Sequence, residues 1–353
     1  MLGTIHFGLF DWLDRQPTML WKTYHEHLQL LTIADQLGFF CYHLAEHHAT
    51  PAGMAPSPNL FLAAAAQCTR KIRLGPLCYI LPLYHPLRLV EEICMLDHLC
   101  NGRLDIGIGR GVSPHELAYH GVEPKNAGEM FQEAVRLLQT AFLNERLTYQ
   151  GNFFHYQDVP REIVPYQQPY PPLWYPTSNS ATITWLGEQG FNTVLRGSPN
   201  VLRGRVTRYW QVWQAHSHEP DRLNAHVLEP KVGITAQVFI AETDEQAEKV
   251  AREAHRTWFE TFDQLWSAFG QSKDYYCGDF DAMMEEERMI VGSPARVRQQ
   301  IARLIEITKA NYFVASLFWG NLTYEHMHTS LLLFAKYVMP EFMGRQDAEN
   351  TSA

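Results

Sequence analysis

The chain has 353 residues, of which 46% are hydrophobic and 19% are charged, and its formal net charge is −9 at pH 7. This length allows one barrel-sized domain or two ordinary ones, and the negative charge argues against nucleic acid or an anionic membrane as a partner. We expect no membrane span, because no run of about 18 apolar residues occurs, and no secretory signal. The six cysteines include no CxxC pair and are typical of free thiols in the cytoplasm.

Short apolar stretches alternate with longer stretches whose apolar residues have helical spacing. The short stretches predict eight strands, at residues 4–10, 39–45, 72–81, 104–108, 173–176, 193–196, 232–241 and 312–318. The longer stretches predict helices at residues 21–37, 59–68, 86–99, 129–142, 181–189, 200–214, 244–262, 295–308 and 324–337. Two polar stretches, at about 144–172 and 270–289, are expected to be irregular insertions in loops.

This alternation predicts an α/β fold with a parallel sheet covered by helices. Eight strand–helix units fit a single (β/α)8 TIM barrel over residues 1–343 better than an open sheet, with residues 344–353 as a flexible tail. A doubly wound sheet remains the alternative. Such a sheet usually has a glycine-rich turn after its first strand, whereas Phe10 is followed here by Asp11, Trp12 and Leu13.

A glycine-rich segment, residues 101–111 (NGRLDIGIGRG), predicts a turn, a buried strand and an exit that carries Arg110. Glycines allow a ligand to approach the backbone closely, and a guanidinium can bind two phosphate oxygens. Residues 177–182, after the fifth strand, place hydroxyl and amide groups at a helix start, which suits an anion. An exposed arginine and plain helix capping by Ser178 or Ser180 would explain the same residues without a ligand. Taken together, the two segments favour a phosphate site.

The second strand is followed by Glu46, His47 and His48, at the end of the barrel where active sites lie. A histidine at this place can give or take a proton. A metal site is less favoured, because adjacent histidines on a strand point apart and no H-E-x-x-H motif or third ligand accompanies them. We therefore predict no metal, while a packed structural histidine remains an alternative.

Four segments resemble, in order and spacing, the bacterial luciferase-like family of flavin-dependent monooxygenases. They are residues 44–50 (LAEHHAT), 81–88 (LPLYHPLR), 102–111 (GRLDIGIGRG) and 291–294 (VGSP). The resemblance is strongest over residues 1–120 and weaker through to residue 340. It implies a (β/α)8 barrel that binds reduced FMN (FMNH2) at its C-terminal mouth. Oxygen then adds at the flavin C4a, and the resulting peroxy species oxidises a small organic substrate.

The resemblance also implies roles for single residues. His47 would manage protons around the flavin, Arg110 would hold the FMN phosphate, and the backbone at Val112 would follow it. Further cofactor contacts would come from Ser178, Asn179 and Thr182 at the helix start and from Leu77 and Cys78, where the family has a cis peptide that does not involve proline. Gly109 stands where the light-emitting member has a reactive cysteine, so we expect no light emission.

The expected partners also come from this resemblance, whereas the expected substrate rests on the residues themselves. A separate NAD(P)H:flavin reductase would supply FMNH2, and the chain would form a homodimer through the helix at 86–99. An oxidoreductase dependent on coenzyme F420 and a non-catalytic flavin-binding subunit are the alternatives. We expect an uncharged aldehyde, ketone or terpenoid-like substrate, since no Lys or Arg cluster beyond Arg110 is predicted at the mouth. Candidate pocket walls are Phe10, Trp12, Tyr79, Trp174, Phe318 and Trp319.

Overall fold

The structure is a computed structural model that describes residues 4–267 and 279–342. Its main sheet pairs neighbouring strands in parallel, in the order β3-β2-β1-β12-β10-β9-β8-β5-β4, with β11 beside β10. The strands are β1 (His6–Asp11), β2 (Cys41–Leu44), β3 (Arg73–Pro76), β4 (Tyr79–Ile80), β5 (Ile106–Gly109), β8 (Leu173–Thr177), β9 (Asn192–Leu195), β10 (Val232–Ile240), β11 (Met289–Gly292) and β12 (Tyr312–Phe318).

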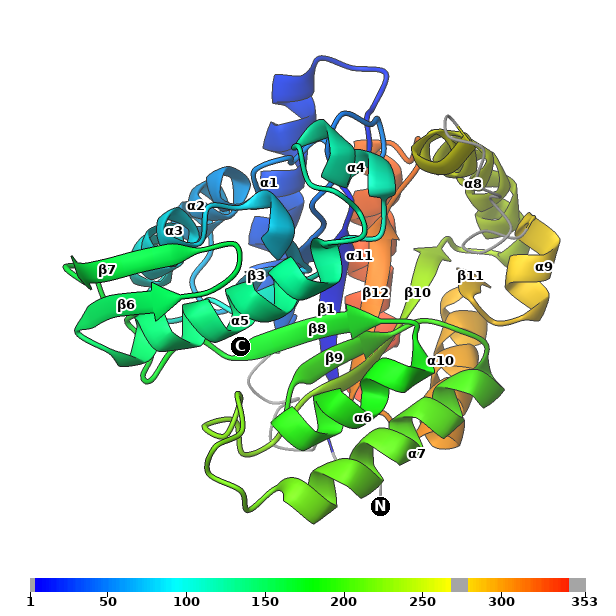
Figure 1. The fold of residues 1–353 in the computed structure, drawn as a ribbon. Coiled ribbons are helices and arrows are strands. Elements are labelled where there is room, and N and C mark those ends of the chain that lie inside the picture. The colour runs from blue at the N-terminus through cyan, green and yellow to red at the C-terminus, as the bar shows by residue number, and fades with distance from the viewer. Residues whose placement is uncertain (1–3, 268–278, 343–353) are drawn as a thin grey trace.

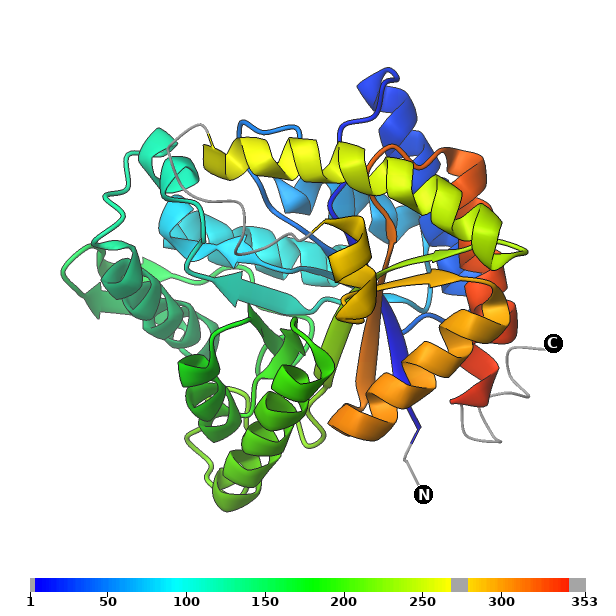
Figure 2. The ribbon, with the colours of Figure 1, turned by 90° about the vertical axis from the view of Figure 1, so that its right-hand side faces the viewer.

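The sheet curls nearly closed, because its two end strands belong to one stretch of chain. β3 pairs with β2 and β4 pairs with β5, and an isolated bridge joins Leu74 to Leu104. Helices surround the sheet, as Figures 1 and 2 show. The predicted (β/α)8 barrel is therefore confirmed.

The helices follow the strands in chain order. They are α1 (Leu20–Gln36), α2 (Pro58–Cys68), α3 (Pro86–Leu99), α4 (Pro114–Tyr119), α5 (Ala127–Leu143), α6 (Ser180–Gln189), α7 (Pro199–His216), α8 (Asp244–Ser267), α9 (Phe280–Glu285), α10 (Pro294–Thr308) and α11 (Tyr324–Tyr337). Several begin with proline at the first helical position, which suits a residue that lacks an N–H. No helix within the described ranges is long and apolar enough to cross a membrane.

The structure differs from the prediction in the third strand and in both insertions. The predicted strand at 72–81 is broken into β3 and β4 by the cis peptide between Leu77 and Cys78. The stretch 144–172 contains an antiparallel hairpin of β6 (Arg146–Gln150) and β7 (His155–Pro160), whose mostly polar sequences give no apolar run. In the stretch 270–289, α9 and β11 were not predicted, and the residues before 279 lie outside the described part, as does the tail at 344–353.

Tyr312 fills the interior of the barrel beneath its mouth. The neighbouring strands carry Gly8 and Gly233, where an added Cβ would lie 1.8 Å from the Tyr312 hydroxyl oxygen and 2.8 Å from its ring, respectively. Nε2 of His43 lies 2.8 Å from the same hydroxyl. Two glycines thus make room for one large side chain, and a buried histidine completes its hydrogen bonding.

We expect His43 to make folding sensitive to acid. Its burial lowers the pKa of the imidazole from 6.5 to about 4. Between pH 6.5 and about pH 4, His43 therefore binds a proton in the unfolded chain but not in the folded chain. The free energy of unfolding consequently falls as the pH drops through this range. The whole effect is on the order of 3 kcal/mol. The His43→Gln protein should lose less of its free energy of unfolding between pH 6.5 and 4, measured by urea titration. The exposed His25→Gln serves as the control, and equal pH slopes in His43→Gln and the unsubstituted protein would contradict the assignment.

Candidate active site

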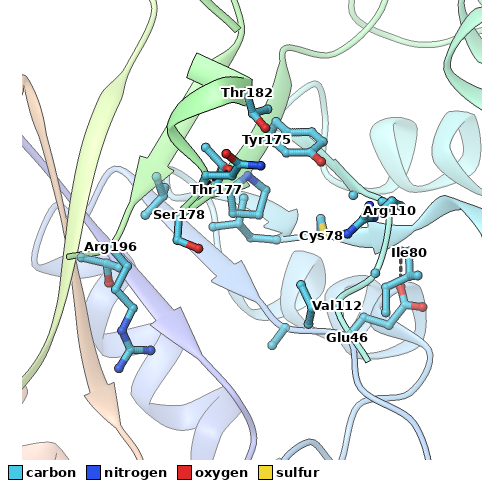
Figure 3. Close-up of a pocket in the computed structure, with 18 of the residues that line it drawn as sticks. Glu46, Cys78, Ile80, Arg110, Val112, Tyr175, Thr177, Ser178, Thr182 and Arg196 are labelled. Atoms are coloured by element: carbon cyan, nitrogen blue, oxygen red, sulfur yellow. Dashed lines mark hydrogen bonds between the residues drawn. The ribbon is translucent and has the colours of Figure 1, made fainter. Parts of the chain in front are cut away.

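A cavity of about 710 Å³ lies at the C-terminal ends of the barrel strands, as the close-up in Figure 3 shows. Every residue predicted to be catalytic or to bind the cofactor lines this cavity. These residues are His47, Leu77, Cys78, Arg110, Val112, Ser178, Asn179 and Thr182. The structure thus brings together residues from four separate parts of the chain, while their individual roles stay predictions.

One end of the cavity is formed by Arg110 and the start of α6. Arg110 directly follows β5 and is exposed toward the cavity. Its charge acts on Tyr175, where burial raises the pKa of the phenol to about 12 and the guanidinium opposes this shift. The helix is capped by Asn179, whose Oδ1 accepts a hydrogen bond from the Ala181 N–H at 2.9 Å. The cap is therefore neither Ser178 nor Ser180, the two considered from the sequence.

The glycines of β5 allow this strand to lie close to the broken third strand. An added Cβ on Gly107 would lie 2.1 Å from the carbonyl oxygen of Pro76, and one on Gly109 would lie 2.2 Å from Sγ of Cys78. The Cys78 thiol therefore occupies the space that a side chain at position 109 would take. Gly128, on α5, also borders the cavity, and a Cβ added there would enter open space.

His47 is fixed in place from two sides. Its Nδ1 donates a hydrogen bond to Oε1 of Glu116 at 3.0 Å, and the backbone N–H of His48 donates to the same oxygen at 2.7 Å. The ring of Trp12 stacks on His47 with 5.4 Å between ring centroids and 15° between planes. Because Nδ1 is held by Glu116, Nε2 is the ring nitrogen that can exchange a proton with a ligand.

Glu116 lies on α4 and was not predicted to belong to the site. Burial tends to raise the pKa of its carboxyl, but the hydrogen bonds and charges of His47 and His48 outweigh burial, and the pKa is lowered. The other neighbour, Glu46, accepts from Nε2 of His48 at 2.9 Å and from the Tyr84 hydroxyl at 2.7 Å. Within residues 4–267 and 279–342 no group of three His, Cys, Asp or Glu side chains could hold a metal ion.

The aromatic walls are only partly those expected. Phe10 and Trp12 line the cavity, whereas four predicted wall residues are packed in the core instead: Tyr79, Trp174, Phe318 and Trp319. The aromatic residues that border the cavity and were missed are Phe131, Tyr175, Trp185 and Phe262. A strand residue with an aromatic side chain can face the helices or the mouth, and its sequence does not say which.

The structure also places a second arginine in the cavity, where no Lys or Arg cluster beyond Arg110 was predicted. Arg196 follows β9, and its guanidinium lies 5.7 Å from the ring centroid of Trp258 on α8. Figure 3 shows Arg110 and Arg196 on opposite sides of the cavity. The predicted strand at 193–196 ends on Arg196. This place at the C-terminal end of a barrel strand was the one sequence signal that Arg196 borders the cavity.

A family model described as luciferase-like monooxygenase matches residues 5–309. The chain belongs to this family. Its resemblance to the family, stated from four segments, is confirmed over most of its length.

Three relatives illustrate the family. The chain is 36% identical over 340 residues to the uncharacterized protein y4wF of Sinorhizobium fredii, which covers 96% of both chains. It is 26% identical over 350 residues to limonene 1,2-monooxygenase of Rhodococcus erythropolis, covering 97% of this chain and 88% of that one. It is 27% identical over 254 residues to the oxygenase component of flavin-dependent trigonelline monooxygenase of Acinetobacter baylyi, covering 70% and 69%. These luciferase-like relatives support an oxidoreductase that uses a flavin.

Three solved structures share the fold. The monooxygenase RslO1 of Streptomyces bottropensis has a TM-score of 0.85 at 23% identity and covers 96% of this chain and 100% of that one. The oxygenating constituent of 3,6-diketocamphane monooxygenase of Pseudomonas putida, a type II Baeyer–Villiger monooxygenase in complex with FMN, has a TM-score of 0.77 at 22% identity and covers 96% and 98%. A coenzyme F420-dependent tetrahydromethanopterin reductase of Methanopyrus kandleri has a TM-score of 0.67 at 18% identity and covers 96% and 100%.

We expect Glu116→Gln to destabilise this luciferase-like barrel in a pH-dependent way. The ionised carboxylate accepts two hydrogen bonds, and losing its charge should cost about 1.5–3 kcal/mol of the free energy of unfolding at pH 7. Because the folded-state pKa lies below the ordinary value of 4.5, this stability is present above pH 4.5 and is lost as the pH falls through the folded pKa. Urea titrations at pH 7 and pH 4 should show the difference shrinking at the lower pH. The exposed Glu123→Gln is the matched control, and a pH-independent difference would contradict the role of the charge.

Proposed function

We propose that the chain is a flavin-dependent monooxygenase that uses reduced FMN and O2 to oxidise a small organic substrate. One observation carries the proposal: a single cavity joins an anion-binding end, at Arg110 and α6, to a fixed histidine that can exchange a proton. We further propose that a separate NAD(P)H:flavin reductase supplies the reduced flavin. The name of the trigonelline relative, an oxygenase component, supports this division of labour.

The residues present fit FMN. Arg110 and the positive end of the α6 helix dipole suit a phosphate dianion. Phe131 and Tyr175 pack edge to face, with 5.6 Å between centroids, and give the cavity an aromatic wall that suits a ring system. The open space beside Gly128 leaves room for a ligand on the same wall. The cavity volume of about 710 Å³ lies within the usual range for cofactor sites.

Each group in the cavity then has a defined task. Bound reduced FMN supplies two electrons and the atom at which O2 reacts. Arg110 and α6 bind the phosphate and so fix the position of the ligand in the cavity. Trp12 and Phe262, with 5.5 Å between ring centroids, exclude water from the mouth. Glu116 keeps the His47 ring in one tautomer and orientation, so that Nε2 can give a proton to, or take one from, the reacting oxygen.

The first experiment is an anaerobic titration of the purified chain with FMNH2, followed by mixing with oxygenated buffer. We expect binding, and then an absorbing species that outlasts the oxidation of free FMNH2 and differs from oxidised FMN. Arg110→Gln should weaken FMN binding by about ten- to a hundredfold, because a charge-assisted contact is lost, and should leave riboflavin binding unchanged. The exposed Arg136→Gln is the control. Immediate oxidation, or binding of coenzyme F420 in place of FMN, would favour the hydride-transferring alternative.

We also propose a homodimer that forms through α2 and α3. These packed helices expose three large apolar side chains, with exposed fractions of 76% for Leu60, 54% for Met95 and 46% for Leu99. An apolar surface of this kind is typical of subunit contacts. Light scattering should give twice the mass of the 40.7 kDa chain, and Met95→Glu should halve it. A monomer at micromolar concentration would refute the dimer.

We propose that the chain is located in the cytoplasm. The five cysteines of the described residues are all free thiols, which is typical of a reducing cytoplasm. Fractionation of cells that produce the chain should recover it with the cytoplasmic proteins.

A further inference from the structure

Two polar side chains on the floor of the cavity have no hydrogen-bond partner. Gln237 of β10 and Ser316 of β12 face each other as register partners, line the cavity and are 4% and 3% exposed. Within the described ranges, the side-chain amide nitrogen and oxygen of Gln237 and the hydroxyl of Ser316 make no hydrogen bond. Buried polar groups are almost always paired, so this floor offers three unused hydrogen-bonding atoms to a ligand.

The neighbouring polar groups of the same strands are paired. The hydroxyl of Thr235, two residues before Gln237, donates to the carbonyl of Val314 at 2.9 Å. One layer deeper, the Tyr312 hydroxyl is hydrogen-bonded with His43. On β10 and β12, the unpaired side-chain atoms of Gln237 and Ser316 therefore belong to the layer that borders the cavity. Unpaired polar groups reduce the stability of the folded chain unless a ligand satisfies them.

The surroundings of this floor are aromatic. Phe10, on the strand beside β12, lies edge-on to Trp12 with 4.9 Å between centroids. Trp12 in turn stacks on His47 and lies 5.5 Å from Phe262. An apolar wall thus connects the polar floor to the proton-exchanging histidine. This wall suits a ligand with a hydrocarbon skeleton and one polar group.

The floor also lies across the barrel from the anion-binding end. In the strand order, β10 and β12 are separated from β5, which leads to Arg110, by β9 and β8 on one side and by β1, β2 and β3 on the other. A phosphate bound at Arg110 would therefore not occupy the floor, and the floor stays available to another group. The floor itself carries an amide and a hydroxyl, which are neutral, so it suits a neutral oxygen better than a carboxylate.

We propose that Gln237 and Ser316 form a carbonyl-binding subsite and that the substrate is an apolar compound with a ketone or comparable carbonyl group. The Gln237 amide N–H and the Ser316 O–H donate to the carbonyl oxygen, and the hydrocarbon part packs on Phe10 and Trp12. That this ligand is the substrate rests on the proposed function; that the floor binds a carbonyl does not.

The test measures binding in the absence of flavin. Ketones of increasing size, from cyclohexanone to camphor, are each compared with the saturated hydrocarbon of the same skeleton by calorimetric or fluorescence titration. The unsubstituted chain should bind at least one ketone about tenfold more tightly than its hydrocarbon. In Gln237→Met this preference should fall about tenfold, and in Ser316→Ala by a smaller factor. Gln132→Met, the same change on another wall of the cavity, is the control and should keep the preference.

A second measurement separates a ligand-binding role from a structural one. Since the Gln237 amide is unpaired, the ligand-free Gln237→Met protein should melt at the same temperature as the unsubstituted chain or higher. Its affinity for FMN should be unchanged. A lower melting temperature would show that Gln237 supports the fold, and a loss of FMN affinity would assign the floor to the flavin; either result overturns the proposal.

The remaining outcomes are also decisive. If no ketone binds more tightly than its hydrocarbon, the carbonyl subsite is refuted. Tighter binding of a carboxylate such as benzoate, lost in Arg196→Gln, would show an anionic ligand and would overturn the proposal as well. If the ketone preference holds while the FMNH2 titration fails, the subsite stands and only the monooxygenase function falls.

Discussion

The close approach of β5 to the broken third strand is the constraint on which the barrel and its site depend. β3 and β4 pair with different neighbours, and the sheet closes where this stretch of chain meets the segment of β5, at the bridge from Leu74 to Leu104 and at β4. At that point a Cβ on Gly107 would collide with the carbonyl of Pro76. Because glycine is present, closure brings Leu77, Cys78 and Arg110 to one cavity. The same contact therefore completes the fold and assembles the candidate cofactor site.

Three pairs of a histidine and a carboxylate surround the mouth and fix its loops. They are Asp11 with His27 at 2.6 Å, Glu46 with His48 at 2.9 Å, and Glu116 with His47 at 3.0 Å. The first two tie the ends of β1 and β2 to their surroundings, and the third connects α4 to the loop after β2. Only the third presents a ring nitrogen to the cavity. The mouth thus combines rigid loops with one position for proton exchange, as preorganised catalysis requires.

Features that depend on a local sequence pattern could be predicted. Features that depend on the direction of a side chain, or on contacts between residues far apart in the chain, could not. All eight barrel strands came from apolar runs, and Arg110 and the start of α6 came from glycine and capping chemistry. Glu116 was missed because it contacts His47 across 69 residues, and nothing in the sequence pairs the two. Trp174 was misplaced because an apolar run does not say which side chains face the mouth and which the core. β11 was not predicted because it is only four residues long and directly follows a charged stretch.

The thiol of Cys78 and the missing side chain of Gly109 occupy one volume, since a Cβ at position 109 would lie 2.2 Å from the sulfur. The two positions are therefore epistatic: a larger residue at one demands a smaller residue at the other. In this chain a cysteine fills that volume from the strand opposite Gly109. Moving the thiol from position 78 to position 109 therefore requires substitutions at both positions. This requirement constrains the order in which the two residues can change during divergence.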